Sequence, residues 1–279
     1  MIIADMHTHC AFSGDSETPP EEQLTEALRH NAKYYCFTDH MDMYIPEGPD
    51  ADGFAFEPFV LDVPAYTKKI EELSREYADR VNVLTGIELG LHPAVFAEYK
   101  KLLASCRFDF VLGSIHTVDD LDPYYDRYWI KHPGRTGVEL YFNTMLDCLN
   151  GYDDFDSLAH LDYVIRYCRN EKGEPALRNY SYNDFGEQID EVLKWVISHD
   201  KALEVNTAGI KYGLGRPNPS GEVLKRYKEL GGSRITIGSD GHKPEHIFYA
   251  FPEVEALLKS LGFTSYEVFK DRKPMTFSF

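Results

Sequence analysis

The sequence predicts an α/β fold in which a mainly parallel sheet closes into a barrel of about seven βα units. Short apolar, β-rich runs alternate along the chain with segments whose apolar residues recur at helical spacing, an order typical of parallel sheets. Nearly all of the β-rich runs also carry histidine, aspartate, glutamate or asparagine at or near their C-terminal ends. A parallel barrel brings every strand end to one face, whereas an open sheet gathers only the ends near its switch point. The barrel is therefore the favoured arrangement.

Seven β-rich runs are the expected strands. In chain order they are MIIADMH, KYYCFTDH, VNVLTGIEL, FDFVLGSIH, DSLAHLDYV, KALEVNT and RITIGSDGH. Six segments between them are the expected helices, because their apolar residues recur three and four positions apart. In chain order these are PEEQLTEALRHN, PAYTKKIEELSREYADR, HPAVFAEYKKLLAS, GVELYFNTMLDCLN, YNDFGEQIDEVLKWVISHD and PSGEVLKRYKELGG.

Two irregular stretches interrupt this alternation. Residues 41–62 and 117–135 are rich in proline, aspartate and aromatic residues, and both follow strand ends that carry candidate ligands. Long loops at such places are more often lids or specificity loops than linkers. No domain boundary is evident, so a single domain over residues 1–279 is expected.

The charge balance argues against polyanionic partners. The chain has 29 lysines and arginines against 46 aspartates and glutamates, a formal net charge of −17. Such a surface repels nucleic acid and anionic membranes, so neither is an expected partner. A small phosphate-bearing substrate is compatible with this charge only if the site has local positive charge, which bound metal ions supply.

Cysteine usage and hydropathy predict a soluble, cytoplasmic protein. The five cysteines are scattered, odd in number and without a Cys-x-x-Cys pair, a pattern typical of reduced thiols. The apolar run at the N-terminus is too short for a signal peptide, and no apolar stretch approaches the roughly 20 residues that span a bilayer.

Histidines at the strand ends point to metal binding. His7 and His9 lie two residues apart, so in an extended strand they project side by side, as two ligands of one ion do. Four more histidines lie at or just past later strand ends: His40, His116, His160 and His242. The other five lie in helices or loops and are expected to be surface or capping residues: His30, His92, His132, His199 and His246.

Three carboxylates join these six histidines. Glu88 and Asp240 end apolar strands, where an unpaired buried carboxylate is rare, and Asp15 follows the first strand in a loop that can reach over the barrel mouth. The set exceeds the four ligands of one tetrahedral ion, but with a bridging carboxylate it suits two or three neighbouring ions. The alternative, a mouth of hydrogen-bonded histidines without metal, carries a large desolvation cost.

The ordered motifs D-M-H-T-H, F-T-D-H, G-I-E-L, G-S-I-H, A-H-L-D and G-S-D-G-H resemble those of the PHP (polymerase and histidinol phosphatase) superfamily. The resemblance runs from Asp5 to His242. The segments G-S-I-H, E-V-N-T-A-G and A-H-L-D-Y-V-I-R-Y resemble its stand-alone histidinol-phosphatase branch. The resemblance implies a distorted (β/α)7 barrel, similar to a TIM barrel, with a trinuclear metal site at the C-terminal ends of the strands.

Carried over by position, the resemblance implies three metal sites. The first ion would be held by His7, His9, Glu88 and Asp240. Glu88 would bridge to a second ion on His116 and His160. The third ion would be held by Asp15, His40 and His242. Some relatives have histidine at position 15, and aspartate there makes the site more oxygen-rich, so that zinc, iron and manganese all stay open. Asp39 is expected to orient an imidazole from behind.

The implied reaction is hydrolysis of a phosphate monoester, for which bound metal ions lower the pKa of the attacking water. Glu88 and Asp240 count among the catalytic groups as ligands of these ions. Arg166 resembles the phosphate clamp of the family, a role that suits the guanidinium fork. A second basic contact is expected after E-V-N-T-A-G, and Lys211 and Arg216 are both candidates for it.

The resemblance makes L-histidinol phosphate, an intermediate of histidine biosynthesis, the expected substrate. Its ammonium and imidazole need an acidic or carbonyl partner away from the metals, and the candidates are Asp42, Asp119, Asp120 and Asp122. Two other functions stay open: a PHP phosphoesterase acting on a nucleotide or sugar phosphate, and a non-catalytic PHP module. The complete ligand set counts against the module. The native metal, the general acid and the oligomeric state stay open.

Overall fold

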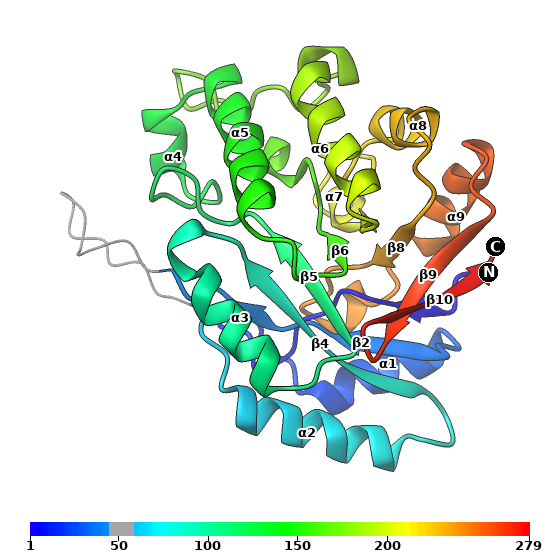
Figure 1. Ribbon diagram of the computed structural model, residues 1–279. Helices are drawn as coiled ribbons and strands as arrows, with labels where there is room; N and C mark the ends of the chain where they lie inside the picture. Colours follow the sequence, from blue (N-terminus) through cyan, green and yellow to red (C-terminus); the bar gives the residue numbers. More distant parts are fainter. Residues whose placement is uncertain (45–58) are drawn as a thin grey trace.

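A computed structural model describes residues 1–44 and 59–279. Its main sheet is a barrel of parallel strands with the helices on the outside (Figure 1). The strands are β1 (Ala4–Asp5), β2 (Tyr34–Phe37), β3 (His40–Met41), β4 (Asn82–Gly90), β5 (Phe110–Ser114), β6 (Ser157–Leu158), β7 (Ala202–Asn206) and β8 (Ile235–Gly238). Their order in the sheet is β1-β2-β4-β5-β6-β7-β8, with β3 also paired to β4. The predicted α/β barrel is confirmed.

The strand predicted over 33–40 is divided into β2 and β3. Between the two, the Thr38 amide donates to the carbonyl of Thr8 at 2.8 Å, and the Asp39 carboxylate accepts from the Cys10 amide at 2.8 Å. These bonds turn the chain toward the segment after β1, and β3 then continues the pairing, with His40 opposite Glu88. When β2 and β3 are counted as one interrupted strand, the barrel has the predicted seven.

The first and last strands of the barrel meet at a seam. The Met6 amide donates to the carbonyl of Ile237 at 3.0 Å, and the Asp240 amide donates to the carbonyl of His7 at 2.8 Å. Beyond them, Thr8 forms a parallel bridge with Gly241. The barrel is therefore nearly closed, and the segment after β1 lies beside the segment after β8.

All six predicted helices are present. They are α1 (Pro20–Arg29), α2 (Val63–Glu76), α3 (Phe96–Ser105), α5 (Arg135–Gly151), α6 (Gly186–Ser198) and α8 (Gly221–Glu229). Each buries one apolar face; α2, for example, buries Tyr66, Ile70 and Leu73, while the side chain of Asp62 caps its N-terminus by accepting from the Ala65 amide. Three further helices were not predicted: α4 (Asp126–Lys131), α7 (Ala208–Lys211) and α9 (Phe251–Ser260).

An antiparallel hairpin, also not predicted, closes the end of the barrel where the strands begin. It consists of β9 (Ser265–Lys270) and β10 (Lys273–Ser278). The hydroxyl of Tyr266 accepts from the Ile3 amide just before β1, and the amide of Arg272 donates to the carbonyl of Asp109 just before β5. The functional side chains predicted at the strand C-termini therefore lie at the opposite end.

The predicted loops have different outcomes. Most of the 41–62 stretch, residues 45–58, lies outside the described residues. The 117–135 stretch contains the short helix α4, after a turn in which Asp119 and Asp120 have positive φ. Among the helices that the structure describes, none combines the length and the apolar character needed to cross a bilayer.

Candidate metal centre and active site

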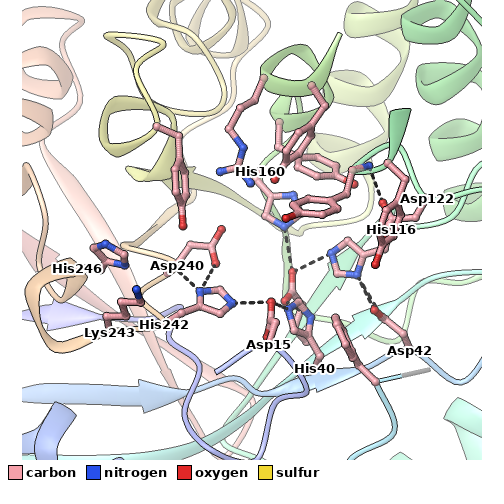
Figure 2. Close-up of a pocket in the computed structure, with 18 residues that line it drawn as sticks. Asp15, His40, Asp42, His116, Asp122, His160, Asp240, His242, Lys243 and His246 are labelled. Atoms are coloured by element: carbon pink, nitrogen blue, oxygen red, sulfur yellow. Dashed lines mark hydrogen bonds and ion pairs between the residues drawn. The ribbon is translucent and has the colours of Figure 1, made fainter. Parts of the chain in front are cut away.

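A cavity of about 490 Å³ opens at the C-terminal ends of the strands. Its wall includes seven of the nine predicted metal ligands: Asp15, His40, Glu88, His116, His160, Asp240 and His242. Figure 2 shows the imidazoles of His40, His116, His160 and His242 directed toward the interior of this cavity from separate strand ends. His7 and His9 are fully buried directly beneath. The structure thus brings all nine side chains together.

Glu88, near the end of β4, lies at the centre of this cluster. Its carboxylate is 0% exposed. The Oε1 atom lies 3.0 Å from His160 Nε2 and 3.4 Å from His116 Nε2, and it also accepts from the hydroxyl of Ser114. The Oε2 atom faces three other imidazoles, those of His7, His9 and His40, at 2.9–3.4 Å. One carboxylate thus faces five histidines.

His7 and His9 follow β1 and project side by side, as the alternation of the strand predicts. Their Nε2 atoms are 2.9 Å apart, and His9 Nε2 lies 3.5 Å from the Oδ1 atom of Asp240. Each of these two nitrogen atoms also lies 3.3–3.9 Å from Oε2 of Glu88 and from Oδ1 of Asp240. A tetrahedral ion with ligand bonds of roughly 2.0–2.2 Å separates its ligand atoms by about 3.3–3.6 Å, so the spacing suits one ion.

Asp15 lies on the other side of the cluster, between two imidazoles (Figure 2). Its Oδ2 atom is 3.0 Å from His242 Nε2 and 3.5 Å from His40 Nε2. The ring of His9 is stacked between the rings of His40 and His242, with centroid distances of 4.2 and 4.3 Å. The nitrogen atoms of these three histidines also lie close enough together to hold an ion.

Protein acceptors behind the cluster orient four of the imidazoles. The Nδ1 atoms of His7, His9 and His116 contact Glu204, Ser13 and Asp42, respectively, at 2.6–3.1 Å. His242 Nδ1 contacts the carbonyl of Asp240 at 3.0 Å. A ring that donates through Nδ1 keeps the Nε2 lone pair free for a metal. The expected role of Asp39 is realised through Ser13, whose hydroxyl donates to Asp39 at 2.8 Å.

The charges of the cluster shift its pKa values strongly. Burial favours the uncharged form of Glu88, but the neighbouring His7, His40 and His116 more than offset this and hold its pKa well below the usual range. The imidazole of His116 is also buried, yet Asp42 and Glu88 raise its pKa to about 10. Without another cation, protons on the histidines therefore have to balance the carboxylates.

This donor set fits divalent metal ions. Imidazole nitrogens and carboxylate oxygens are ligands for zinc, iron and manganese. Two buried atoms at the centre, Oε2 of Glu88 and Nδ1 of His40, lie 2.9 Å apart as an ion pair but have no partner with hydrogen-bond geometry among the described residues. An orphaned carboxylate oxygen surrounded by imidazole nitrogens is costly in a dry interior and favourable beside a cation.

The three predicted basic residues differ in whether they reach the cavity. Arg166 lines the cavity, and its guanidinium lies over the rings of Tyr167 and Tyr212 at 4.4 and 4.0 Å from their centroids. Lys211 lies behind the cavity wall, where its ammonium donates to the carbonyl of Asp240 at 2.9 Å; burial lowers its pKa to about 8. Arg216 is not among the residues that line the cavity, and its guanidinium lies over the ring of Tyr180.

Of the four candidate acids, Asp42 and Asp122 line the cavity. Asp42 is already engaged by His116. Burial raises the pKa of Asp122 to about 6, and its Oδ1 atom accepts from the amide of Tyr124. Asp119 instead lies 2.7 Å from both Lys131 and His132, and Asp120 accepts from the hydroxyl of Tyr44.

Sequence reasoning missed several groups at the site. Glu204 lies within the run KALEVNT and was read as part of the strand alone. His246, expected to be a surface or capping residue, lines the cavity together with Lys243. Tyrosines 124, 125, 163, 167 and 212 also contribute to the wall. No local signal distinguished these residues, because their positions depend on how loops from different strand ends come together.

Comparisons with known proteins agree with this geometry. Residues 5–208 match the PHP domain family. The histidinol-phosphatase of Lactococcus lactis is 30% identical over 270 residues, covering 96% of this chain and 95% of that protein. A probable histidinol-phosphatase of Clostridium acetobutylicum is 33% identical over 246 residues, covering 88% and 89%.

A solved structure extends the similarity to the whole fold. The crystal structure of the histidinol phosphate phosphatase of Lactococcus lactis, complexed with zinc, L-histidinol and phosphate, superposes with a TM-score of 0.86 at 28% identity. The superposition covers 98% of each chain. The predicted distorted (β/α)7 barrel is thus confirmed over essentially the full length.

Proposed function

The chain belongs to the PHP domain family, and from this premise we propose that the cavity hydrolyses L-histidinol phosphate to L-histidinol and phosphate. The protein is a metal-dependent phosphoric monoester hydrolase of the histidinol-phosphatase type, as its relatives are. The observation that carries the proposal is the complete cluster around Glu88, in which nine metal-competent side chains from separate strand ends meet in one cavity. A degenerate, non-catalytic module is expected to have lost part of this set.

The proposed metal assignment follows the contacts of the cluster. The first ion is assigned to His7, His9, Glu88 and Asp240. The second is assigned to Glu88, His116 and His160. The third is assigned to Asp15, His40 and His242. Zinc, iron and manganese are all compatible with these ligands. When bound, such ions lower the pKa of water and neutralise charge on the phosphoryl group.

The chain itself binds and orients the phosphate. Arg166 is held by two aromatic rings, so its guanidinium fork is presented to the cavity in a fixed direction and suits two phosphoryl oxygens. Of the other cations, Lys243 lines the cavity whereas Lys211 is engaged by the carbonyl of Asp240. We therefore assign the second basic contact to Lys243 in place of Lys211 or Arg216.

The leaving group is assigned to the side of the cavity that carries Asp122, which lies across from Lys243 (Figure 2). Asp122 is held by the amide of Tyr124, and the rings of Tyr163 and Tyr167 line the same cavity, with Tyr167 against Arg166. A carboxylate beside aromatic faces suits an ammonium and an imidazole. In the reaction, the oxygen of water forms a bond to phosphorus, the ester P–O bond breaks, and the alcohol of histidinol leaves with a proton.

The proposed cellular context is histidine biosynthesis in the cytoplasm. All five cysteines are free thiols, four of them buried, in accord with a reducing compartment. The absence of nucleic-acid partners stays a prediction from the net charge of −17.

The test is kcat/KM for phosphate release from L-histidinol phosphate, set against p-nitrophenyl phosphate, with the metal content of the same sample determined. We expect a preference of at least about a hundredfold for histidinol phosphate, the effect of satisfying a buried polar partner in the leaving group. Comparable low rates on both esters would overturn the substrate assignment. No hydrolysis of either ester by the metal-loaded protein would overturn the phosphatase itself.

A further inference from the structure

Glu204 is a buried carboxylate of β7 that touches the cluster from behind. It is 1% exposed, and its two oxygens have different partners. Oε1 lies 2.6 Å from His7 Nδ1. Oε2 accepts from the backbone amide of His160 at 2.7 Å and from the side-chain amide of Asn206 at 3.2 Å. One side chain therefore reaches two candidate ligands that belong to different ions in the assignment above.

The two contacts constrain the ligands in different ways. By accepting from Nδ1, Glu204 holds His7 in the tautomer whose Nε2 lone pair faces Glu88 and Asp240. At His160 it holds the backbone, where φ is 20°, a positive value that non-glycine residues rarely adopt. With that backbone held, His160 Nε2 lies 3.0 Å from Oε1 of Glu88.

The neighbouring strand, β8, leaves space for the carboxylate of Glu204. Gly238 ends β8, and a Cβ atom added there would lie 2.6 Å from Oε1 of Glu204 and 2.3 Å from Cβ of His7. Any larger residue would displace both groups. The first glycine of the G-S-D-G-H motif is thereby explained by the space that the pair of Glu204 and His7 occupies.

We propose that Glu204 is a positioning residue that sets His7 and His160 together, so that the first and second metal ions are loaded as a pair. This inference rests on the proposed metal assignment. It differs from the role of Asp42, which contacts the imidazole of one ligand, His116. Ser13 makes the corresponding link on the other side, since its hydroxyl contacts His9 Nδ1 and accepts from the amide of His40.

The variant Glu204→Gln isolates this role because glutamine keeps the size of the side chain but has only one acceptor oxygen. If that oxygen faces His7, the amide nitrogen meets the donors of His160 and Asn206, and both are left unpaired. If the amide is reversed, its N–H group faces His7 Nδ1 and favours the tautomer that carries its proton on Nε2, where the metal binds. Either orientation disturbs one of the two sites.

The experiment measures zinc retained per chain by the purified protein during dialysis against graded concentrations of a chelator, together with Tm before and after metal removal. Wild type is expected to lose two ions in one step. Glu204→Gln is expected to release the same two ions at a tenfold to hundredfold lower chelator concentration, the usual cost of losing such a partner. Because the substitution leaves buried donors unpaired with or without metal, the metal-free Tm is expected to fall modestly, and the Tm of the loaded protein is expected to fall by more.

Asp156→Asn is the matched control. Asp156 is also a buried carboxylate, but it pairs with Arg272 at the far end of the barrel and is not a predicted ligand. This variant should lower Tm and leave the zinc titration unchanged. If Glu204→Gln does not fold, Glu204→Asp is measured instead, because a side chain one methylene shorter retains the charge but cannot reach both partners.

The possible outcomes distinguish a failure of the positioning role of Glu204 from a failure of the proposed function. Wild-type zinc retention in a folded Glu204 variant would overturn the positioning role while leaving the proposed function intact. Loss of only one ion would overturn the pairing. A wild-type protein that retains no stoichiometric metal and hydrolyses no phosphate ester would overturn the proposed function first.

Discussion

The two ends of the barrel both bury carboxylates, but they balance them with different groups. At the end closed by the hairpin, Asp156 lies 2.6 Å from the guanidinium of Arg272, and Glu267 lies 3.0 Å from that of Arg234. At the end with the cavity, Glu88 and Asp240 face imidazoles. An arginine is charged at every relevant pH, whereas an imidazole is charged only when it carries an extra proton.

This difference shows which buried charges belong to the fold and which to the function. At the hairpin end, the chain itself supplies partners for these carboxylates. Besides the two arginine pairs, Asp109 accepts hydrogen bonds from the backbone amides of Thr85 and Asp271. The cavity end needs protons or metal ions from outside to balance its carboxylates. Both ends contain buried carboxylates, so burial does not distinguish them. They differ in whether the opposing group is a permanently charged arginine or an imidazole that is charged only when protonated. The predictions below test this distinction in order of their expected effect on catalysis.

The largest effect is expected for Glu88→Gln. Glutamine has almost the same size, but it removes the charge that faces five imidazoles and, under the proposed assignment, the ligand that the first and second ions share. We expect kcat/KM for L-histidinol phosphate to fall by about 10³-fold or more, with a parallel loss of bound metal by elemental analysis. Near-normal activity in this variant would contradict the central place of Glu88.

A smaller effect is expected for Arg166→Ala. Removing a charge-assisted contact to phosphate costs about 1.5–3 kcal/mol, which is roughly a tenfold to hundredfold increase in KM. Because both esters carry the phosphoryl group, KM should rise for L-histidinol phosphate and for p-nitrophenyl phosphate alike. Arg166→Lys keeps the charge without the fork and should recover part of the loss. Unchanged KM in the metal-loaded alanine variant would remove Arg166 from the site.

Asp122→Asn should affect only the natural substrate. The amide keeps the acceptor for Tyr124 but loses the charge that is proposed to face the ammonium, so KM for L-histidinol phosphate should rise about tenfold while KM for p-nitrophenyl phosphate stays constant. In wild type the carboxylate, with its pKa raised to about 6, is charged above that pH and neutral below it. The KM for L-histidinol phosphate divided by the KM for p-nitrophenyl phosphate should therefore rise as the pH falls through about 6. This pH dependence should be absent in Asp122→Asn.

The smallest effect on catalysis is expected at the hairpin end. Arg272→Met leaves Asp156 buried without its cation, which should lower the free energy of unfolding by about 2 kcal/mol. The zinc content and kcat/KM should stay at the wild-type level, measured beside a urea unfolding curve. A loss of metal in this variant would show that the two ends are coupled, against the distinction drawn above.

Sequence patterns predicted those parts of the molecule whose place in the fold follows from the order of residues along one strand or helix. Alternation of strands and helices predicted the barrel, and polar residues at strand ends predicted which side chains meet, because a parallel barrel places all those ends together. The helix α9 and the hairpin β9–β10 were missed, since they follow the last motif and nothing local relates them to the barrel. The short helix α4 was missed within a stretch read as a loop.

The less accurate site predictions concerned residues whose role depends on contacts between loops. Lys211 and Arg216 were equal candidates by spacing, yet one reaches the back of Asp240 and the other lies against Tyr180. Glu204 alternates along its strand like any inward residue, and only the approach of His7 across Gly238 gives it a chemical role. Spacing along the chain carries no information on such contacts.

The seam between β1 and β8 has a consequence for how the protein acquires its metal. Under the proposed assignment, the first ion joins ligands before and after this seam. It therefore closes a loop of about 230 residues, and bringing the ends of such a loop together from the unfolded chain has a considerable entropic cost. During synthesis His7 and His9 emerge from the ribosome long before Asp240, so this site is completed only when Asp240 has been added. Retention of that ion would therefore be a late event in biogenesis, one that distinguishes finished barrels from truncated ones.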